Sequence, residues 1–176
     1  SAEGYYISGN IVNNGEIIST FDENYLRMTG ASKTITGSGK FTNSKLFADG
    51  TTTFDDNLNA ASAFTETFVN AGKSLTIATG RTFKNGTMGN YGTLTIAGTG
   101  IINNTSDWVN GSTGTVTFGG AGTIYAGANW TNDGTFTAGT ASTVEFNGST
   151  SGNTINGTTA FYNATINKGS STCNNP

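Results

Sequence analysis

A glycine recurs every 20 to 22 residues over most of this chain, and a short run of alternating residues follows nearly every one. Sequence periods of this size are typical of proteins built from stacked repeats. The period therefore predicts a solenoid with one repeat per turn. The glycines that follow it are Gly30, Gly50, Gly72, Gly92, Gly114 and Gly134.

The residues after a repeat glycine alternate in the manner of a half-buried strand. After Gly92, Leu94 and Ile96 would point to one side of a strand, and the threonines between them to the other. Alternation with a period of two indicates a strand. Two further strand-sized pieces complete each repeat. We therefore predict an all-β, single-domain parallel β-helix with about 20–22 residues and three short strands per turn.

Large apolar residues at repeated positions are expected to stack from turn to turn into one core. The predicted core stack comprises Leu26, Phe47, Phe68, Met88, Trp108 and Trp130 before the repeat glycines, and Leu75, Leu94, Val116 and Phe136 after them. Asparagines are expected to form a ladder at one corner, each amide bonding to the next turn. They are Asn70, Asn90, Asn110 and Asn132.

The solenoid domain is predicted to span residues 1–167, with a polar tail over 168–176. Residues 1–20 are expected to form either the first turn or a strand that pairs with a neighbouring molecule. Between Phe54 and Val69 a solenoid turn with an irregular corner is the favoured interpretation, and a short helix is the alternative. Cys173, the only cysteine, could link two chains, but an incidental thiol in the tail is the simpler interpretation.

The composition agrees with a solenoid and excludes several other classes. Hydrophobic residues make up 34% of the chain and charged residues only 11%, whereas disordered chains combine low hydrophobicity with high charge. A narrow core with Thr-, Ser- and Asn-rich outer faces accounts for both values. The eight Lys and Arg residues are scattered, which argues against nucleic-acid binding. No apolar run approaches the length of a membrane span.

Two stretches near the C-terminal end resemble a known class of protein. Residues 134–148 read Gly-Thr-Phe-Thr-Ala-Gly-Thr-Ala-Ser-Thr-Val-Glu-Phe-Asn-Gly, and residues 157–167 read Gly-Thr-Thr-Ala-Phe-Tyr-Asn-Ala-Thr-Ile-Asn. Both resemble the repeats of large bacterial cell-surface β-solenoid adhesins, and are similar in style to autotransporter passenger and filamentous haemagglutinin-type domains. The resemblance implies a secreted, extracellular or cell-surface protein with a non-catalytic role in adhesion or in fibres.

The chain offers few groups for catalysis or metal binding. It has no histidine and one cysteine, which removes the commonest general base and the cysteine-based metal centres. Asp55 and Asp56 form a calcium site in one interpretation and a solvated corner in the favoured one. Asp49 and Asp133 precede repeat glycines in separate turns and are expected to shape corners. We therefore predict a protein that is not an enzyme, with no metal and no cofactor.

The two ends of a solenoid expose unpaired strand edges, and the sequence shows no helix suited to cover them. Open ends favour head-to-tail association of identical chains into a filament, or pairing of a terminal strand with a neighbour. We therefore predict a structural subunit of an extracellular filament. The residues expected at the contacts are Tyr5, Tyr6, Ile7, Ile11 and Val12 at one end, and Phe161 and Ile166 at the other.

Two alternative functions remain open at this level. One is a fragment of an adhesin that binds a glycan or another host or abiotic surface, with Tyr91, Tyr125 and Trp130 as platforms only if they face outward. The other is ice binding by a Thr-x-Thr face, although threonine also suits any outward strand position. That face is expected to comprise Thr93, Thr95, Thr115, Thr117, Thr135 and Thr137, with Thr51/Thr53 and Thr34/Thr36 below them.

Overall fold

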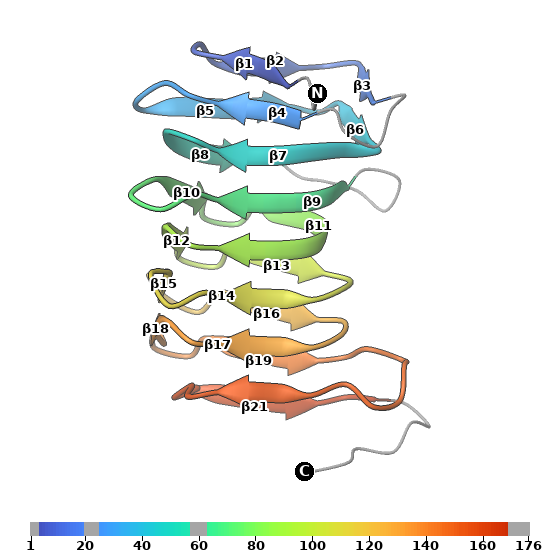
Figure 1. The fold of residues 1–176 in the computed structure, drawn as a ribbon, viewed down its shortest axis with the longest axis vertical. Coiled ribbons are helices and arrows are strands. Elements are labelled where there is room, and N and C mark those ends of the chain that lie inside the picture. Colours follow the sequence, from blue (N-terminus) through green and yellow to red (C-terminus); the bar gives the residue numbers. More distant parts are fainter. Residues whose placement is uncertain (1–3, 20–24, 57–62, 169–176) are drawn as a thin grey trace.

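The computed structural model describes residues 4–19, 25–56 and 63–168. Within these ranges every regular element is a β-strand, and every strand pair is parallel. The strands coil into a β-solenoid of about seven turns with three strands per turn. Figure 1 shows the turns stacked in chain order from the N-terminal to the C-terminal end. The predicted fold class is therefore confirmed.

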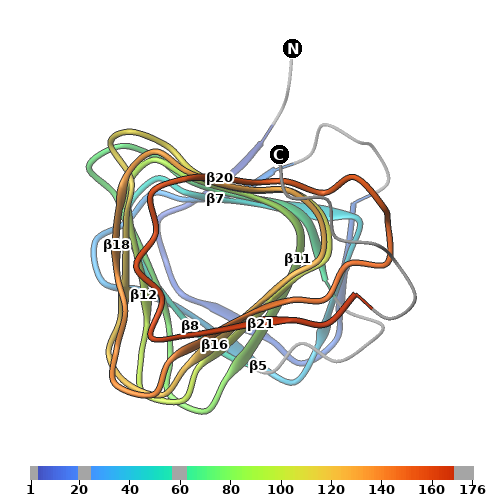
Figure 2. The same cartoon turned by 90° about the horizontal axis from the view of Figure 1, so that it is seen from below.

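Viewed along the stack, the turns lie nearly over one another as a rounded triangle (Figure 2). Its first side, face 1, belongs to the largest sheet. Face 1 runs through β1 (Tyr5–Ile7), β4 (Tyr25–Met28), β7 (Ser44–Ala48), β9 (Phe64–Val69), the second half of β11 (Thr82–Asn90), β14 (Trp108–Asn110), β17 (Trp130–Asn132) and β20 (Ile155–Gly157).

The other two sides complete each turn. Face 2 is a separate sheet made of β2 (Ile11–Asn13), β5 (Lys33–Gly37), β8 (Thr51–Asp55), β10 (Ser74–Ile77), β12 (Thr93–Ile96), β15 (Thr115–Phe118) and β18 (Thr135–Thr137). Face 3 holds the pair β3 (Glu16–Ile18) and β6 (Lys40–Thr42), then the first half of β11, β13 (Ile101–Asn104), β16 (Thr123–Ala126), β19 (Thr143–Phe146) and β21 (Asn163–Ile166).

The core forms because each strand alternates between inward apolar and outward polar residues. Strands β10, β13, β15, β16 and β19 all show this alternation of partly exposed and buried positions. The in-register parallel pairing then places each inward residue on the inward residue of the next turn. Trp108 and Trp130 stack in this way, with ring centroids 5.0 Å apart and planes 3° from parallel.

Most of the predicted core stack is buried, including Met88, Trp108 and Trp130 on face 1. Phe136 is half-buried and packs against the core, because its strand β18 is the last of face 2. The prediction is wrong for Phe47 and Phe68, which lie outside the buried cluster. Leu46 and Thr67 take the inward positions instead, and both are fully buried.

The error at Phe68 has a physical cause in the length of one corner. Val69 is the strand partner of Asn90, and Ser74 is the partner of Thr93. The corner between β9 and β10 therefore contains four residues, against two in the next turn. The residue four positions before Gly72 is therefore displaced by one residue from the strand position that the same count reaches from Gly92. A shift of one residue moves a side chain to the opposite face of a strand.

An asparagine ladder crosses one corner inside the solenoid. The Asn90 side-chain amide donates to the Asn110 side-chain oxygen, and the Asn110 amide to the Asn132 oxygen, both at 2.7 Å. Asn132 in turn donates to the Thr158 carbonyl at 2.5 Å. Asn70 is not part of this ladder, contrary to the prediction, because Val69 occupies the equivalent position and Asn70 donates to Asp49.

The first turn and the segment around residue 60 can be compared with their predictions. β1, β2 and β3 pair with β4, β5 and β6 of the same chain, so the described residues near the N-terminus form the first turn. In the described parts of 54–69, β9 is a strand rather than a helix. The predicted corner at 57–62 and the predicted tail with Cys173 lie outside the described residues.

Candidate functional site at the two ends of the solenoid

Each end of the stack presents strands with one free edge. At the N-terminal end, β1, β2 and β3 each pair with one strand of the second turn. At the C-terminal end, β18, β20 and β21 each pair with one strand of the turn before. The outer edges of these six strands therefore carry backbone N–H and C=O groups that no other described strand pairs.

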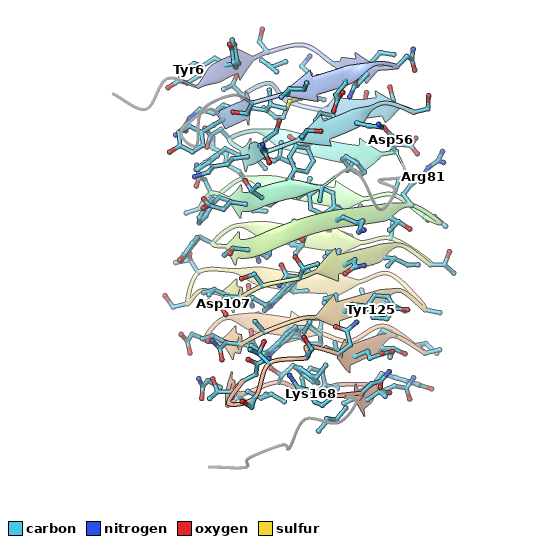
Figure 3. All side chains as sticks on the ribbon, turned by 90° about the vertical axis from the view of Figure 1, so that its right-hand side faces the viewer. Tyr6, Asp56, Arg81, Asp107, Tyr125 and Lys168 are labelled. Carbon is cyan, nitrogen blue, oxygen red and sulfur yellow. The ribbon has the colours of Figure 1, made fainter. Side chains whose placement is uncertain are left out.

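Exposed large hydrophobic side chains are confined almost entirely to these ends. Among the described residues, the set consists of Tyr5, Tyr6, Val12, Ile18, Tyr91, Ile155, Tyr162 and Ile166. Only Tyr91, at 41% exposure, lies in the middle of the stack. Tyr6 is the most exposed, at 72%, and stands at the N-terminal end in Figure 3. Surface of this kind is typical of interaction sites.

The N-terminal end is hollow. A depression of about 490 Å³ opens there between the strands of the first turn. Its lining is formed by Tyr5, Tyr6, Ile7, Ile17, Ile18 and Leu26. Leu26 is part of the buried core, and Ile7 and Ile17 pack against it. The depression is therefore the open mouth of the core column.

The C-terminal end is filled by an aromatic cluster. Phe161 contacts Trp130, Phe136 and Phe146, with ring centroids 5.7–5.8 Å apart. The Trp130 indole N–H also donates to the Thr159 hydroxyl at 3.2 Å. Beyond this cluster, β21 is exposed along its whole length. Of the predicted contact residues, Phe161 is thus half-buried, whereas Ile166 is 58% exposed.

Among the predicted contact residues near the N-terminus, the structure separates three environments. Tyr5, Tyr6 and Val12 are exposed. Ile7 is half-buried in the lining of the hollow. Ile11 is buried and belongs to the core of face 2. The same end therefore combines exposed aromatic rings with accessible core residues.

The predicted Thr-x-Thr face lies on the outer side of face 2, and its two threonine rows align across β12, β15 and β18. The lower part of the prediction needs one correction. Thr34 is the strand partner of Thr53, whereas Thr36 is the partner of Asp55. Thr36 therefore stands outside the two rows, because the corner before β5 differs in length.

The three aromatic residues considered as glycan platforms lie in different surroundings. Trp130 is fully buried and cannot contact a glycan. Tyr91 is exposed, but its ring lies against Gly111 of the next turn, where a side chain would collide with it. Tyr125 is half-buried on the outer side of β16, between Asn103 and Glu145 of the adjacent strands. The three rings therefore form no common surface.

Three of the four acidic candidates are engaged in ion pairs or buried, whereas Asp133 is exposed at its corner. Asp55 accepts from Arg81 at 2.6 Å, and Asp49 from Arg27 at 2.5 Å. Asp56 is only 3% exposed. Within the described ranges, no group of three or more acidic or cysteine side chains could hold a metal ion. Asp49 shapes its corner as predicted, since it also accepts from Asn70.

An outward aromatic ladder on face 1 was not predicted. The Arg27 guanidinium lies 4.7 Å from the Phe47 ring centroid and 5.7 Å from that of Tyr6. Phe47 stacks on Phe68 at 5.0 Å. The Phe68 ring then covers Gly89, where a side chain would collide with it. This ladder could have been found in the sequence from a large residue that lies one turn before a glycine within a strand. The glycine leaves space for the ring of that residue.

Comparison with known proteins gives no relative for this chain: no family model, no curated protein and no solved structure matches it. The described residues also contain no helix of the length and apolar character needed to cross a membrane.

Proposed function

We propose that this chain is a non-catalytic structural subunit of an extracellular filament, in which copies stack head to tail through the ends of the solenoid. The observation that carries the proposal is the distribution of exposed large hydrophobic side chains. All of those in the described residues except Tyr91 lie in the first or last turn. They border free strand edges, which natural proteins ordinarily cover.

Strand direction makes a second copy of the chain the natural partner. A molecule that extends the stack must offer parallel strands in the same direction and on the same three-sided outline. The opposite end of another copy, held in the same orientation, supplies both. Such a contact joins two different surfaces, and a contact of this kind produces open filaments when it does not close into a ring.

The strand register within the chain predicts how the copies pair. Tyr5 continues the inward column of Leu26, and Ile155 continues the inward column of Trp130. Stacking in the same register places Ile155 of one copy on Tyr5 of the next, and Asn156 on Tyr6. The inward columns then run through the contact without interruption.

The two ends also complement each other in shape. The N-terminal end is hollow, and the C-terminal end carries the aromatic cluster around Phe161.

Stacking of whole ends is favoured over donation of a terminal strand, because β1 already pairs with β4 of its own chain. Assembly that survives deletion of residues 1–12 would exclude donation. The extracellular location is the part of the proposal that rests on the resemblance of residues 134–148 and 157–167 to surface solenoid repeats.

Electron microscopy of the purified chain, with light scattering on the same sample, tests the proposal. We expect filaments with an axial repeat of about 35 Å, since about seven turns are spaced by about 4.8 Å. Tyr5→Lys should yield monomers, because it places a charge in the inward column of the contact. Tyr91→Lys is the matched control and should leave the filaments intact. A wild-type chain that stays monomeric at high concentration would overturn the proposal.

A further inference from the structure

The outer side of face 2 carries two straight rows of hydroxyl groups. The first row consists of Thr34, Thr53, Thr76, Thr95, Thr117 and Thr137, each the strand partner of the next. The second row consists of Thr51, Ser74, Thr93, Thr115 and Thr135. Strands β8, β10, β12, β15 and β18 each contribute one hydroxyl to the first row and another to the second.

The rows form a regular two-dimensional lattice. Neighbouring strands of a sheet lie about 4.8 Å apart, and residues two apart along a strand are separated by about 6.6 Å. The surface of hexagonal ice repeats its oxygen atoms at similar intervals in two directions. Hydroxyl groups held at these intervals can therefore take the places of water molecules in the crystal surface.

The lattice is accessible, and all of its own side chains are uncharged. Within the described ranges, the hydroxyl groups of both rows make no hydrogen bond to another protein group. From β12 to β18 the residues beside the rows are small. Gly92, Gly114 and Gly134 directly precede the second row, and Ala97, Gly119 and Gly139 follow the first row two positions on. Charged residues border the rows at Lys33, at Lys73 and in the Asp55–Arg81 pair, and at Asp133, which is exposed two positions before Thr135.

The other two faces do not share this regularity. One outward column of face 1 contains Tyr6, Arg27, Phe47, Phe68, Gly89, Val109, Thr131 and Asn156. One outward column of face 3 contains Lys84, Asn103, Tyr125, Glu145 and Thr165. The preference of threonine for strands acts on all three faces equally. It therefore does not account for two uniform rows on one face alone.

We propose that face 2 binds the surface of ice crystals through these two rows. Ice is an uncharged lattice of water, and its surface matches an uncharged array of hydroxyl groups held at regular intervals. A crystalline polysaccharide is a poorer match, because face 2 has no aromatic ring in the rows on which a sugar could stack. This function is independent of filament formation, since the rows run along the side of the solenoid and not across its ends.

Thermal hysteresis and ice-crystal shaping of the purified chain test the proposal. The variant Thr95→Lys/Thr117→Lys places two bulky charges in the centre of the first row. Its control is Thr123→Lys/Thr143→Lys, which makes the same change at two paired outward positions of face 3. Thermal unfolding monitored by circular dichroism establishes that both variants are folded. The Tyr5→Lys variant is measured as well, because ice binding should persist in a chain that cannot form filaments.

We expect hysteresis and shaped crystals from the wild type and from the face 3 variant, and loss of both from the face 2 variant. A folded wild-type chain without hysteresis or crystal shaping would overturn the proposal. Equal loss in the two double variants would also overturn it, since the effect would not belong to face 2. Binding to cellulose or chitin without an effect on ice would assign the rows to a polysaccharide instead.

Discussion

The two halves of face 1 use large apolar residues in opposite ways. In the C-terminal half, Trp108 and Trp130 point inward and stack in the core with no exposure. In the N-terminal half, Phe47 and Phe68 point outward and stack on the surface, capped by Arg27. The inward position beside Phe68 is held by Thr67, a smaller residue whose hydroxyl has no partner among the described residues.

This difference shows that a repeat glycine does not mark the same place in every turn. Gly92, Gly114 and Gly134 each lie against a carbonyl group of the preceding turn, where a side chain would not fit. In the turn before them the equivalent residue is Lys73 and not a glycine, as shown by its backbone carbonyl, which accepts from the Thr93 N–H. Gly72 lies one residue earlier and has a φ of 71°, which glycine adopts readily, within the turn that the Lys73 N–H closes on the Asn70 carbonyl. Corner length, and not glycine spacing alone, therefore decides which residues enter the core.

The largest effect is expected for Trp108→Ala in the inward stack. Removing this side chain leaves a cavity beneath Trp130, and such substitutions cost about 3–5 kcal/mol of unfolding free energy. Equilibrium unfolding in urea, compared with the wild type, measures the loss. A loss below about 1 kcal/mol would contradict the inward placement, since exposed positions tolerate such changes.

Met88→Ala and Phe68→Ala test the comparison most directly. Met88 is fully buried, so its truncation should cost about 2–5 kcal/mol. Phe68 is the larger side chain but lies outside, and loss of its stacking on Phe47 should cost only about 0.5–1.5 kcal/mol. Urea unfolding of both variants gives the order. If Phe68→Ala were the more costly change, the assignment of the register at β9 would be wrong.

Asn110→Ala tests the ladder that only the C-terminal turns possess. The change removes the amide that donates to Asn132 and the oxygen that accepts from Asn90. A buried polar group left without its partner lowers the free energy of unfolding by about 1–3 kcal/mol. The loss should appear as a lower midpoint of urea unfolding. Asn70→Ala is the control, because Asn70 lies outside the ladder. Equal losses from the two variants would place both residues in comparable surroundings.

The smallest effects are expected at the two arginines. Arg27 pairs with Asp49 at 2.5 Å, and its side chain is 27% exposed. Arg81 pairs with Asp55 and is 40% exposed. Arg27→Met should cost about 1 kcal/mol, because a cation–π contact adds to the ion pair. Arg81→Met should cost no more than about 0.5 kcal/mol. Unfolding at low and high salt checks both, and an effect of Arg81→Met equal to that of Arg27→Met would contradict this order.

The candidate site could be predicted in kind but not in detail. The expectation that both ends are open follows from repeats that run nearly the length of the chain. The different shapes of the ends do not follow from it, because they depend on where single side chains lie. Phe161 closes the C-terminal end by contacting rings from three different strands. Among the residues that the structure describes, no comparable ring fills the depression lined by Ile7 and Ile17.

The sequence by itself determined the class of fold, the period of the turn and the alternation within each strand. These are local properties, since a strand shows its two sides in neighbouring residues and a repeat shows its length in the spacing. It also determined that the Thr-x-Thr pairs of β12, β15 and β18 face outward. Residues close together in the chain carry all of this information.

Only the tertiary structure decided the register between turns. Register depends on how many residues each corner consumes, and a corner of two or four residues leaves the same alternation on either side of it. That count moved Phe68 to the surface, excluded Asn70 from the ladder and aligned Thr34 with Thr53. The physical reason is that hydrogen bonds between turns join residues about 20 positions apart, so stacking and not local preference selects the partners.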